Sequence, residues 1–191
     1  MDGAQKEENT FQIIVLGDSN VGKSCLLHRY MENEYKCPGL TLCVESFAHS
    51  LEIEPGVHVK LSIWDTGGLE IFRPLIRCHY HDSVGGLLVF DITDRVTFEH
   101  IKEWHADLCE AESKVVLILV GQKCDEEELR GVSREEAERL AEELDMPYVE
   151  TSAKTGQNVS EVFENLIQRI YQKLHSHDVL HKCMGLDCTF C

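Results

Sequence analysis

One segment near the N-terminus indicates the fold class directly: Phe11-Gln12-Ile13-Ile14-Val15-Leu16-Gly17-Asp18-Ser19-Asn20-Val21-Gly22-Lys23-Ser24. Its first six residues form a short apolar run typical of a buried strand, and a helical pattern follows. Between them lies a complete G-x-x-x-x-G-K-S motif in the strand–loop–helix context that this motif requires. Glycines let backbone N–H groups approach an anion, and the helix N-terminus favours negative charge. The stretch therefore predicts a phosphate-binding loop rather than a chance glycine-rich turn.

Outward from this loop, apolar runs alternate with helical patterns. Residues 44–53 and 57–64 flank the turn signal Glu54-Pro55-Gly56 and predict a hairpin. Further strands are predicted at 85–90, 115–120 and 147–150, and helices at 23–34, at 97–109, after a capping box from Ser133 to Glu136, and at 159–174. The expected fold is a single α/β phosphate-loop NTPase domain. It has a mostly parallel sheet of about six strands, one antiparallel edge hairpin and helices on both faces.

Length and composition predict one globular domain at residues 11–174, with a polar N-terminal extension at 1–10 and a Cys- and His-containing tail at 175–191. The chain has 191 residues and a formal net charge of −16. This charge disfavours binding to a nucleic-acid backbone, so no nucleic-acid partner is expected. No apolar run is long enough to span a membrane, and residues 1–10 lack the apolar core of a secretory signal. The scattered body cysteines are expected to be reduced in a cytosolic protein.

Two loops that follow neighbouring strands predict a base pocket. Gly121-Gln122-Lys123-Cys124-Asp125 follows the strand at 115–120, and Glu150-Thr151-Ser152-Ala153-Lys154 follows the strand at 147–150. A carboxylate at Asp125 can accept hydrogen bonds from the ring N–H and the exocyclic amine of guanine. Adenine lacks this donor pair and would leave a buried carboxylate unpaired, which is costly. Asp125 alone reads as a solvated loop acid, but the two loops together favour guanine.

A third polar segment, Trp64-Asp65-Thr66-Gly67-Gly68, ends the second strand of the hairpin. In phosphate-loop NTPases an acid at such a place holds Mg²⁺, and we expect Asp65 to do so through a water. The Ser24 hydroxyl is expected to bind Mg²⁺ directly, and Lys23 to reach the β- and γ-phosphates. The Gly68 N–H is expected to meet the γ-phosphate. An ordinary turn acid is the alternative for Asp65.

With these motifs the chain resembles the Ras superfamily, and within it the Rab family, over residues 11–174. Rab-like stretches include 23–27, 59–66 and 88–93. The resemblance implies a GTP/GDP switch with Mg²⁺ in vesicle traffic, in which Tyr35 stacks on guanine and Thr41 is a further Mg²⁺ ligand. The implied nucleotide contacts are Gly17, Ser19, Asn20, Val21, Gly22, Lys23, Ser24, Cys25, Tyr35, Thr41, Gly68, Gln122, Lys123, Asp125, Ser152, Ala153 and Lys154. The implied metal ligands are Ser24, Thr41 and Asp65, and the implied catalytic positions are Lys23, Thr41, Gly68 and Leu69.

The chain also departs from the family pattern. Leu69 stands where the family has the Gln that orients the attacking water, so GTP hydrolysis is expected to be slow. The alternative is a non-hydrolysing, constitutively GTP-bound scaffold, and a phosphate-loop kinase is disfavoured because the base-pocket loops would have no purpose. Gly67 also replaces an Ala of the family pattern, and Gln122 replaces an Asn. Rab effectors often contact three aromatic residues. Here the second of these positions is Trp64, and the other two are Ser46 and His79.

The tail reads Cys188-Thr189-Phe190-Cys191 at its end. By resemblance to Rabs, geranylgeranyl groups are expected on Cys188, Cys191 or both, which would hold the protein on the cytosolic face of an endomembrane. A zinc site formed by His177, His181, Cys183, Cys188 and Cys191, a redox C-x-x-C and an inert tail are the alternatives. The resemblance also implies an exchange factor, an activating protein, a prenylation escort and a GDP-dissociation inhibitor as partners. Effectors are expected to bind from Thr41 to Ser46 and from Gly67 to Tyr80.

Overall fold

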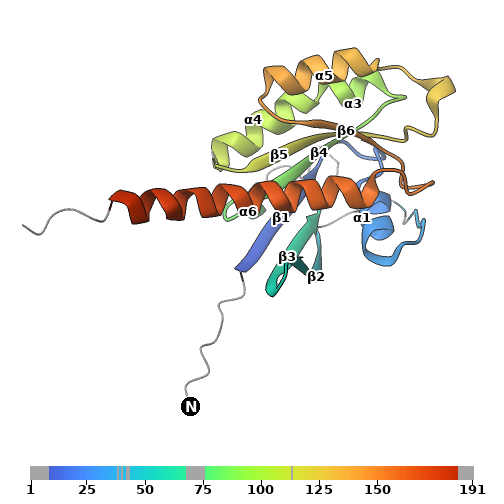
Figure 1. Ribbon diagram of the computed structural model, residues 1–191. Coiled ribbons are helices and arrows are strands. Elements are labelled where there is room, and N and C mark those ends of the chain that lie inside the picture. Colours follow the sequence, from blue (N-terminus) through green and yellow to red (C-terminus); the bar gives the residue numbers. More distant parts are fainter. Residues whose placement is uncertain are drawn as a thin grey trace, which may run out of the picture.

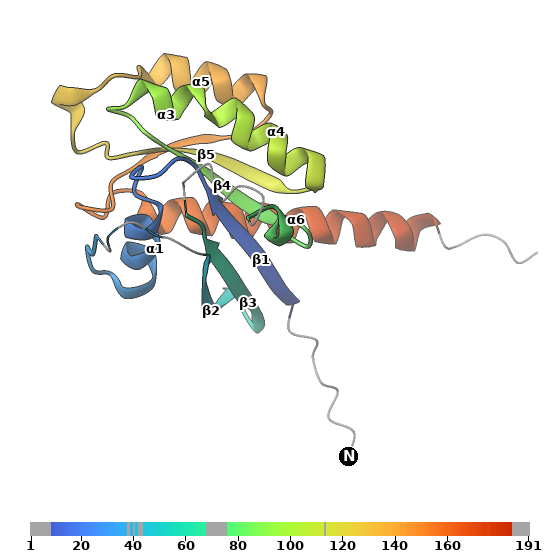
Figure 2. The same cartoon turned by 180° about the vertical axis from the view of Figure 1, so that it is seen from behind.

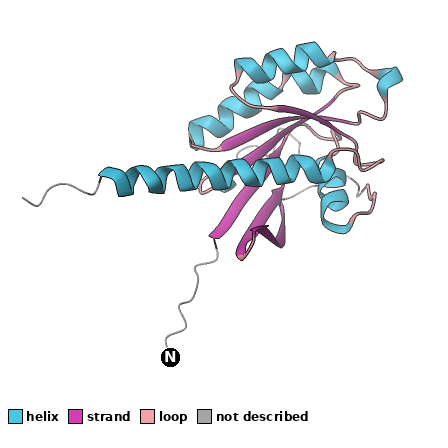
Figure 3. Ribbon diagram, viewed as in Figure 1, coloured by secondary structure: helices cyan, strands magenta, loops and turns pink. Residues whose placement is uncertain are grey.

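The computed structural model describes residues 9–37, 39, 41, 44–67, 76–112 and 114–184 (Figure 1). In chain order its elements are β1 (Asn9–Leu16), α1 (Lys23–Glu32), β2 (Glu45–Glu54), β3 (Val57–Asp65), η2 (Arg77–His79), β4 (Gly85–Asp91), α3 (Arg95–Glu99), α4 (Ile101–Ala111), β5 (Val116–Gln122), η3 (Glu127–Leu129), α5 (Arg134–Glu143), β6 (Tyr148–Thr151) and α6 (Val159–Met184). Strands and helices alternate along most of the chain, as Figure 3 shows.

The six strands form one sheet in the order β2-β3-β1-β4-β5-β6. The hairpin strands β2 and β3 pair antiparallel at one edge, and every other neighbouring pair is parallel. Parallel strands need crossover connections, which the helices supply. The predicted fold class is therefore confirmed, including the antiparallel edge hairpin.

The core lies on both faces of the sheet, and β1 shows how its sequence divides between them. Ile13 and Val15 pack into the cluster formed with α1 and α6, whereas Ile14 and Leu16 pack into the cluster formed with α4 and α5. Successive side chains of a strand point to opposite faces, so a continuous apolar run is buried on both. Figure 2 shows α3, α4 and α5 on the face opposite α6.

Helix α1 ends at Glu32, two residues before its predicted end, and two further helices differ more from their predicted bounds. The single helix predicted at 97–109 is two helices, α3 and α4, which meet at His100. The Glu103 N–H bonds to the His100 carbonyl three residues back, so the chain tightens at this point. The other helix, α6, continues to Met184 instead of ending near residue 174, since no Gly or Pro interrupts it there. Among its side chains up to residue 175, which the structure describes, the last in the buried core is Ile170. No helix among the described residues is long and apolar enough to cross a membrane.

The predicted capping box at the start of α5 is present. Ser133 Oγ accepts from the Glu136 N–H at 3.2 Å, and Glu136 Oε2 accepts from the Ser133 N–H at 3.1 Å. We expect Ser133→Ala to lower the free energy of unfolding by about 1 kcal/mol, because one N–H of the first turn loses its partner. Guanidinium chloride unfolding measures this. Ser160→Ala, at an exposed position of α6, is the control; an equal loss there would contradict the capping explanation.

Candidate functional site

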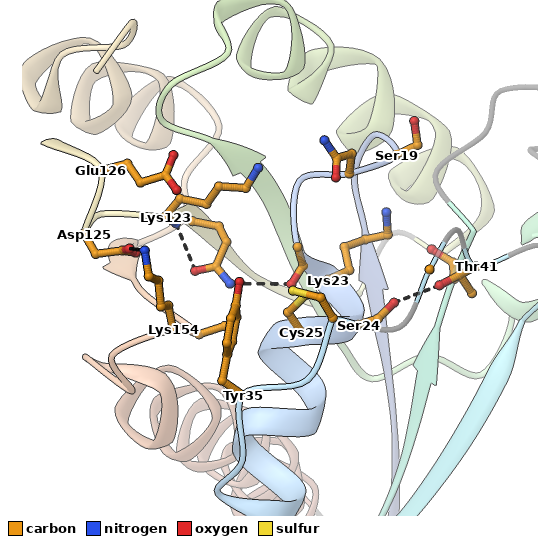
Figure 4. A pocket seen from close by; sticks show the side chains of 17 residues that line it. Ser19, Lys23, Ser24, Cys25, Tyr35, Thr41, Lys123, Asp125, Glu126 and Lys154 are labelled. Carbon is orange, nitrogen blue, oxygen red and sulfur yellow. Dashed lines mark hydrogen bonds and ion pairs between the residues drawn. The ribbon is translucent and has the colours of Figure 1, made fainter. Parts of the chain in front are cut away.

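A cavity of about 570 Å³ opens at the carboxyl ends of β1, β5 and β6, on the edge where ligands of open α/β sheets bind (Figure 4). Its lining residues are Ser19, Asn20, Gly22, Lys23, Ser24, Cys25, Tyr35, Cys37, Gly39, Thr41, Thr66, Gln122, Lys123, Asp125, Glu126, Ala153 and Lys154. Most of the predicted nucleotide contacts therefore surround one space. Gly17, Val21, Asp65 and Ser152 are buried and are not among these lining residues, whereas Gly68, Leu69, Cys188 and Cys191 lie outside the described residues.

The phosphate loop is held close to β4. At Gly17 the backbone has φ +142°, and a Cβ there would lie 2.0 Å from the Val89 carbonyl oxygen, so only glycine fits. Gly22, with φ +99°, precedes the first turn of α1. Among the described residues, no side chain caps this turn, and the turn itself contains no acidic residue. Its N–H groups therefore remain available for an anion.

Lys23 reaches back over this loop. Its side chain is buried, and Nζ donates to the carbonyl oxygens of Gly17 at 2.9 Å and Asp18 at 2.7 Å. Burial lowers the pKa of Lys23 to about 8, and the negative charges of Asp65 and Asp18 only partly oppose this. A buried ammonium that is paired mainly with carbonyl groups carries an uncompensated cost. A phosphate group fits this position because its charge would offset that cost.

The three predicted metal ligands meet beside Lys23. Ser24 Oγ donates to Asp65 Oδ2 at 2.5 Å and lies 2.8 Å from Thr41 Oγ1. Asp65 Oδ1 is buried and has no hydrogen-bond partner among the described residues. Burial raises the pKa of Asp65, although the Ser24 hydrogen bond and Lys23 oppose the shift. Oxygen ligands around an unsatisfied carboxylate are what a hard cation such as Mg²⁺ prefers.

At the other end of the cavity, Asp125 faces the second predicted loop. Asp125 Oδ1 accepts from Ser152 Oγ at 2.6 Å, and Oδ2 lies 3.5 Å from Lys154 Nζ. Burial raises the pKa of Asp125, but the hydrogen bond from Ser152 and the charge of Lys154 outweigh it, so the net pKa is lowered. The group is therefore an ionised acceptor at neutral pH. Such a carboxylate suits the paired donors on the edge of guanine.

Gln122 connects the base loops to the phosphate loop. Its Oε1 accepts from Thr151 Oγ1 at 2.9 Å and from the Lys123 N–H at 3.1 Å. Its Nε2 lies 3.5 Å from the Gly22 carbonyl oxygen, which is long for a hydrogen bond. The two base loops are thus joined firmly to each other and only loosely to the phosphate loop.

Sequence reasoning missed residues that hold the site from outside. Arg29 on α1 donates to the Ala153 carbonyl at 2.7 Å through Nε and to the Lys154 carbonyl at 2.8 Å through Nη2. Asp18, within the phosphate loop, bonds to His100 and Trp104. These partners lie more than 80 residues from the groups they contact, and no local pattern signals them.

The expected effector surface is described only in part. Trp64 and His79 stack with ring centroids 4.6 Å apart, and Ser46 pairs with Trp64 across the hairpin. The predicted segments from Thr41 to Ser46 and from Gly67 to Tyr80 include residues 42–43 and 68–75, which lie outside the described residues.

Comparison with known proteins agrees with this geometry. The model of the Ras family matches residues 12–172. The chain is similar to mouse Ras-related protein Rab-39A, with 48% identity covering 88% of this chain and 81% of the relative. It is also similar to Ras-related protein RABA5e of Arabidopsis thaliana, with 46% identity over 91% and 80%, and to mouse Ras-related protein Rab-42, with 43% identity over 88% and 81%. The chain belongs to the Ras family and, within it, to the Rab small GTPases.

Proposed function

We propose that this chain is a GTP/GDP switch of membrane traffic that binds guanine nucleotide with Mg²⁺ in the cavity between the phosphate loop and Asp125. One observation carries the proposal: the uncapped helix start, the buried ammonium of Lys23 and the ionised carboxylate of Asp125 face one space. The test is to identify the nucleotide that copurifies with the full chain and to measure its single-turnover hydrolysis. Copurified adenine nucleotide, or equal affinity for ATP and GTP, would contradict the pocket assignment.

The residues would divide the work along the cavity. Lys23 would donate to phosphate oxygens through the N–H that its two loop carbonyls leave available, while the first N–H groups of α1 donate to the same phosphates. Ser24, Thr41 and Asp65 would hold Mg²⁺, which neutralises charge on the phosphates. Tyr35 would cover the base, and Asp125 would accept from its edge. Because Lys23 and Ser24 act on bound substrate and transition state alike, binding does not require rapid hydrolysis.

Lys23 gives this binding a proton linkage. Burial lowers its pKa to about 8, and neighbouring phosphates would raise it. Above pH 8 the free protein has lost the proton that the complex needs, so binding takes up a proton and affinity falls as pH rises. Calorimetry in buffers of different ionisation enthalpy should show more proton uptake on binding at pH 8.5 than at pH 7. Equal uptake at both values would contradict this role.

Leu69 leads us to propose slow hydrolysis. Its side chain has no donor or acceptor, so it can neither hold the attacking water nor share charge in the transition state. We expect Leu69→Gln to raise the single-turnover rate at least severalfold, equivalent to a barrier lower by about 1 kcal/mol or more. Leu69→Met is the matched control, because it changes the side chain without adding a hydrogen-bonding group. Brisk hydrolysis by the unmodified chain, or an unchanged rate in the Gln variant, would leave an ordinary cycling GTPase.

The proposal also includes effector proteins, regulatory proteins and a membrane as partners of this chain. Effector proteins would bind from Thr41 to Ser46 and from Gly67 to Tyr80. An exchange factor, an activating protein, a prenylation escort and a GDP-dissociation inhibitor would act on the chain as they do on other Rabs. Lipid at Cys188, Cys191 or both would hold the protein on the cytosolic face of an endomembrane. The second candidate function is a GTP-bound scaffold with little turnover, which the substitution at Leu69 favours.

A further inference from the structure

The phosphate loop contains a carboxylate, which is a liability in a site for anions. Asp18 is the second residue of the loop, next to Gly17, and Ser19 after it lines the cavity. An unpaired negative charge at this place would repel a diphosphate and weaken binding. However, Asp18 is not among the described residues that line the cavity.

The side chain of Asp18 instead contacts the junction of α3 and α4, the two helices that follow β4 in the chain. His100 Nδ1 lies 2.6 Å from Asp18 Oδ2, and Trp104 Nε1 donates to Asp18 Oδ1 at 2.8 Å. Each carboxylate oxygen thus has its own aromatic N–H partner. An ionised carboxylate only accepts, so His100 Nδ1 carries the hydrogen in this contact. Hydrogen bonds to a charged group are among the stronger ones in proteins.

The break between α3 and α4 brings these two donors to one place. His100 is the junction residue of the two helices, and Trp104 follows one turn later on α4. Trp104 is fully buried in the core, so its ring is fixed. The start of α3 is in turn tied to the end of β4, because Thr97 Oγ1 accepts from the Asp91 N–H at 3.0 Å. The donors therefore stand on a rigid base beside the loop.

The main chain of Asp18 is held from the opposite side. Its carbonyl oxygen accepts from Lys23 Nζ at 2.7 Å. An ammonium has three N–H donors, so Lys23 can keep this contact and still reach a phosphate oxygen. Asp18 is thus held at its main chain by Lys23 and at its side chain by His100 and Trp104.

We infer that His100 is a positioning residue for nucleotide binding, which together with Trp104 satisfies the carboxylate of Asp18 and anchors the phosphate loop to α4. The inference rests on the proposed nucleotide-binding function. His100 is not among the described residues that line the cavity, so we propose no direct contact between His100 and the nucleotide. Removal of the His100 donor leaves Asp18 Oδ2 without its N–H partner, so the negative charge of Asp18 is less well satisfied beside the phosphates and nucleotide should leave faster.

A comparison of two substitutions isolates the donor. His100→Phe keeps a ring but no N–H, and we expect GDP to dissociate about tenfold faster. His100→Asn places its amide nitrogen as many bonds from the backbone as Nδ1, and we expect release within about twofold of the unmodified chain. His105→Phe is the control: His105 lies on the same helix but contacts Cys109. Release as fast in His100→Asn as in His100→Phe would overturn the inference.

A double-mutant cycle then separates positioning from general loss of stability. In an Asp18→Asn background no charge remains to be satisfied, so adding His100→Phe should change the GDP release rate by less than about twofold. Release of a fluorescent GDP from the full-length protein gives the four rates, and thermal unfolding checks that each variant is folded. A tenfold effect of His100→Phe in both backgrounds would show a structural role only. Failure of the unmodified chain to bind GDP would instead refute the proposed function.

Discussion

Asp125→Asn is expected to lower affinity for GDP on the order of a hundredfold or more and to raise affinity for xanthosine diphosphate. The carboxylate accepts from Ser152 through Oδ1, which leaves acceptor capacity for the two N–H donors of guanine. In the Asn variant the amide oxygen can keep the Ser152 bond, and the NH₂ group then faces the base. Guanine presents its own amine there, so two donors oppose each other, whereas xanthine presents a carbonyl oxygen.

Competition between the two diphosphates for the purified full-length chain measures this change. Glu126→Gln is the matched control, because Glu126 lines the same cavity and loses a charge of the same sign. We expect the control to keep its preference for guanine within a fewfold. A general electrostatic effect would change the affinity for GDP in both variants alike. If Asp125→Asn kept full affinity for GDP, Asp125 would be a solvated loop acid, and the base pocket would have to lie elsewhere.

The pocket was predictable because motif spacing and strand order act together. Ser24 and Asp65 are 41 residues apart, yet each follows a recognisable strand. These strands, β1 and β3, are parallel neighbours, so their carboxyl ends meet at one edge. The same reasoning brought Asp125 and Ser152 together at the ends of β5 and β6. The continuous apolar run of β1 likewise predicted burial on both faces.

Contacts that depend on how helices lie over the sheet were not predictable. Arg29 reaches the Ala153 carbonyl only because α1 and α6 cover the same face. His100 reaches Asp18 only because the helix predicted at 97–109 is divided at that residue. A hydrophobic pattern indicates which face of a helix is buried, but it fixes neither the position along the sheet nor a tightened turn. The long continuation of α6 escaped prediction for a related reason, since its apolar pattern stops before the helix does.

Replacement of Cys188 and Cys191 by Ser together is expected to remove nearly all of this protein from membranes in cells. The chain has a formal net charge of −16, and residues 175–191 contain one lysine and no basic run. Charge would therefore repel an anionic leaflet rather than attach the protein to it. Attachment by lipid alone grows by about 0.8 kcal/mol per buried CH₂ group, so one short chain anchors marginally and two anchor stably. If both cysteines carry lipid, each single replacement should weaken attachment; if one does, only its replacement should. The double replacement should abolish attachment in either case.

Fractionation of cells together with mass spectrometry of the C-terminal peptide tests this expectation. The peptide from the membrane fraction should have a prenyl mass on Cys188, Cys191 or both, and the double variant should be recovered in the soluble fraction. Cys183→Ser is the control, since it removes a thiol of the same tail that we do not propose to be lipidated. Unmodified peptide in the membrane fraction, or membrane recovery unchanged by the double replacement, would show that a bound protein rather than lipid holds the chain there.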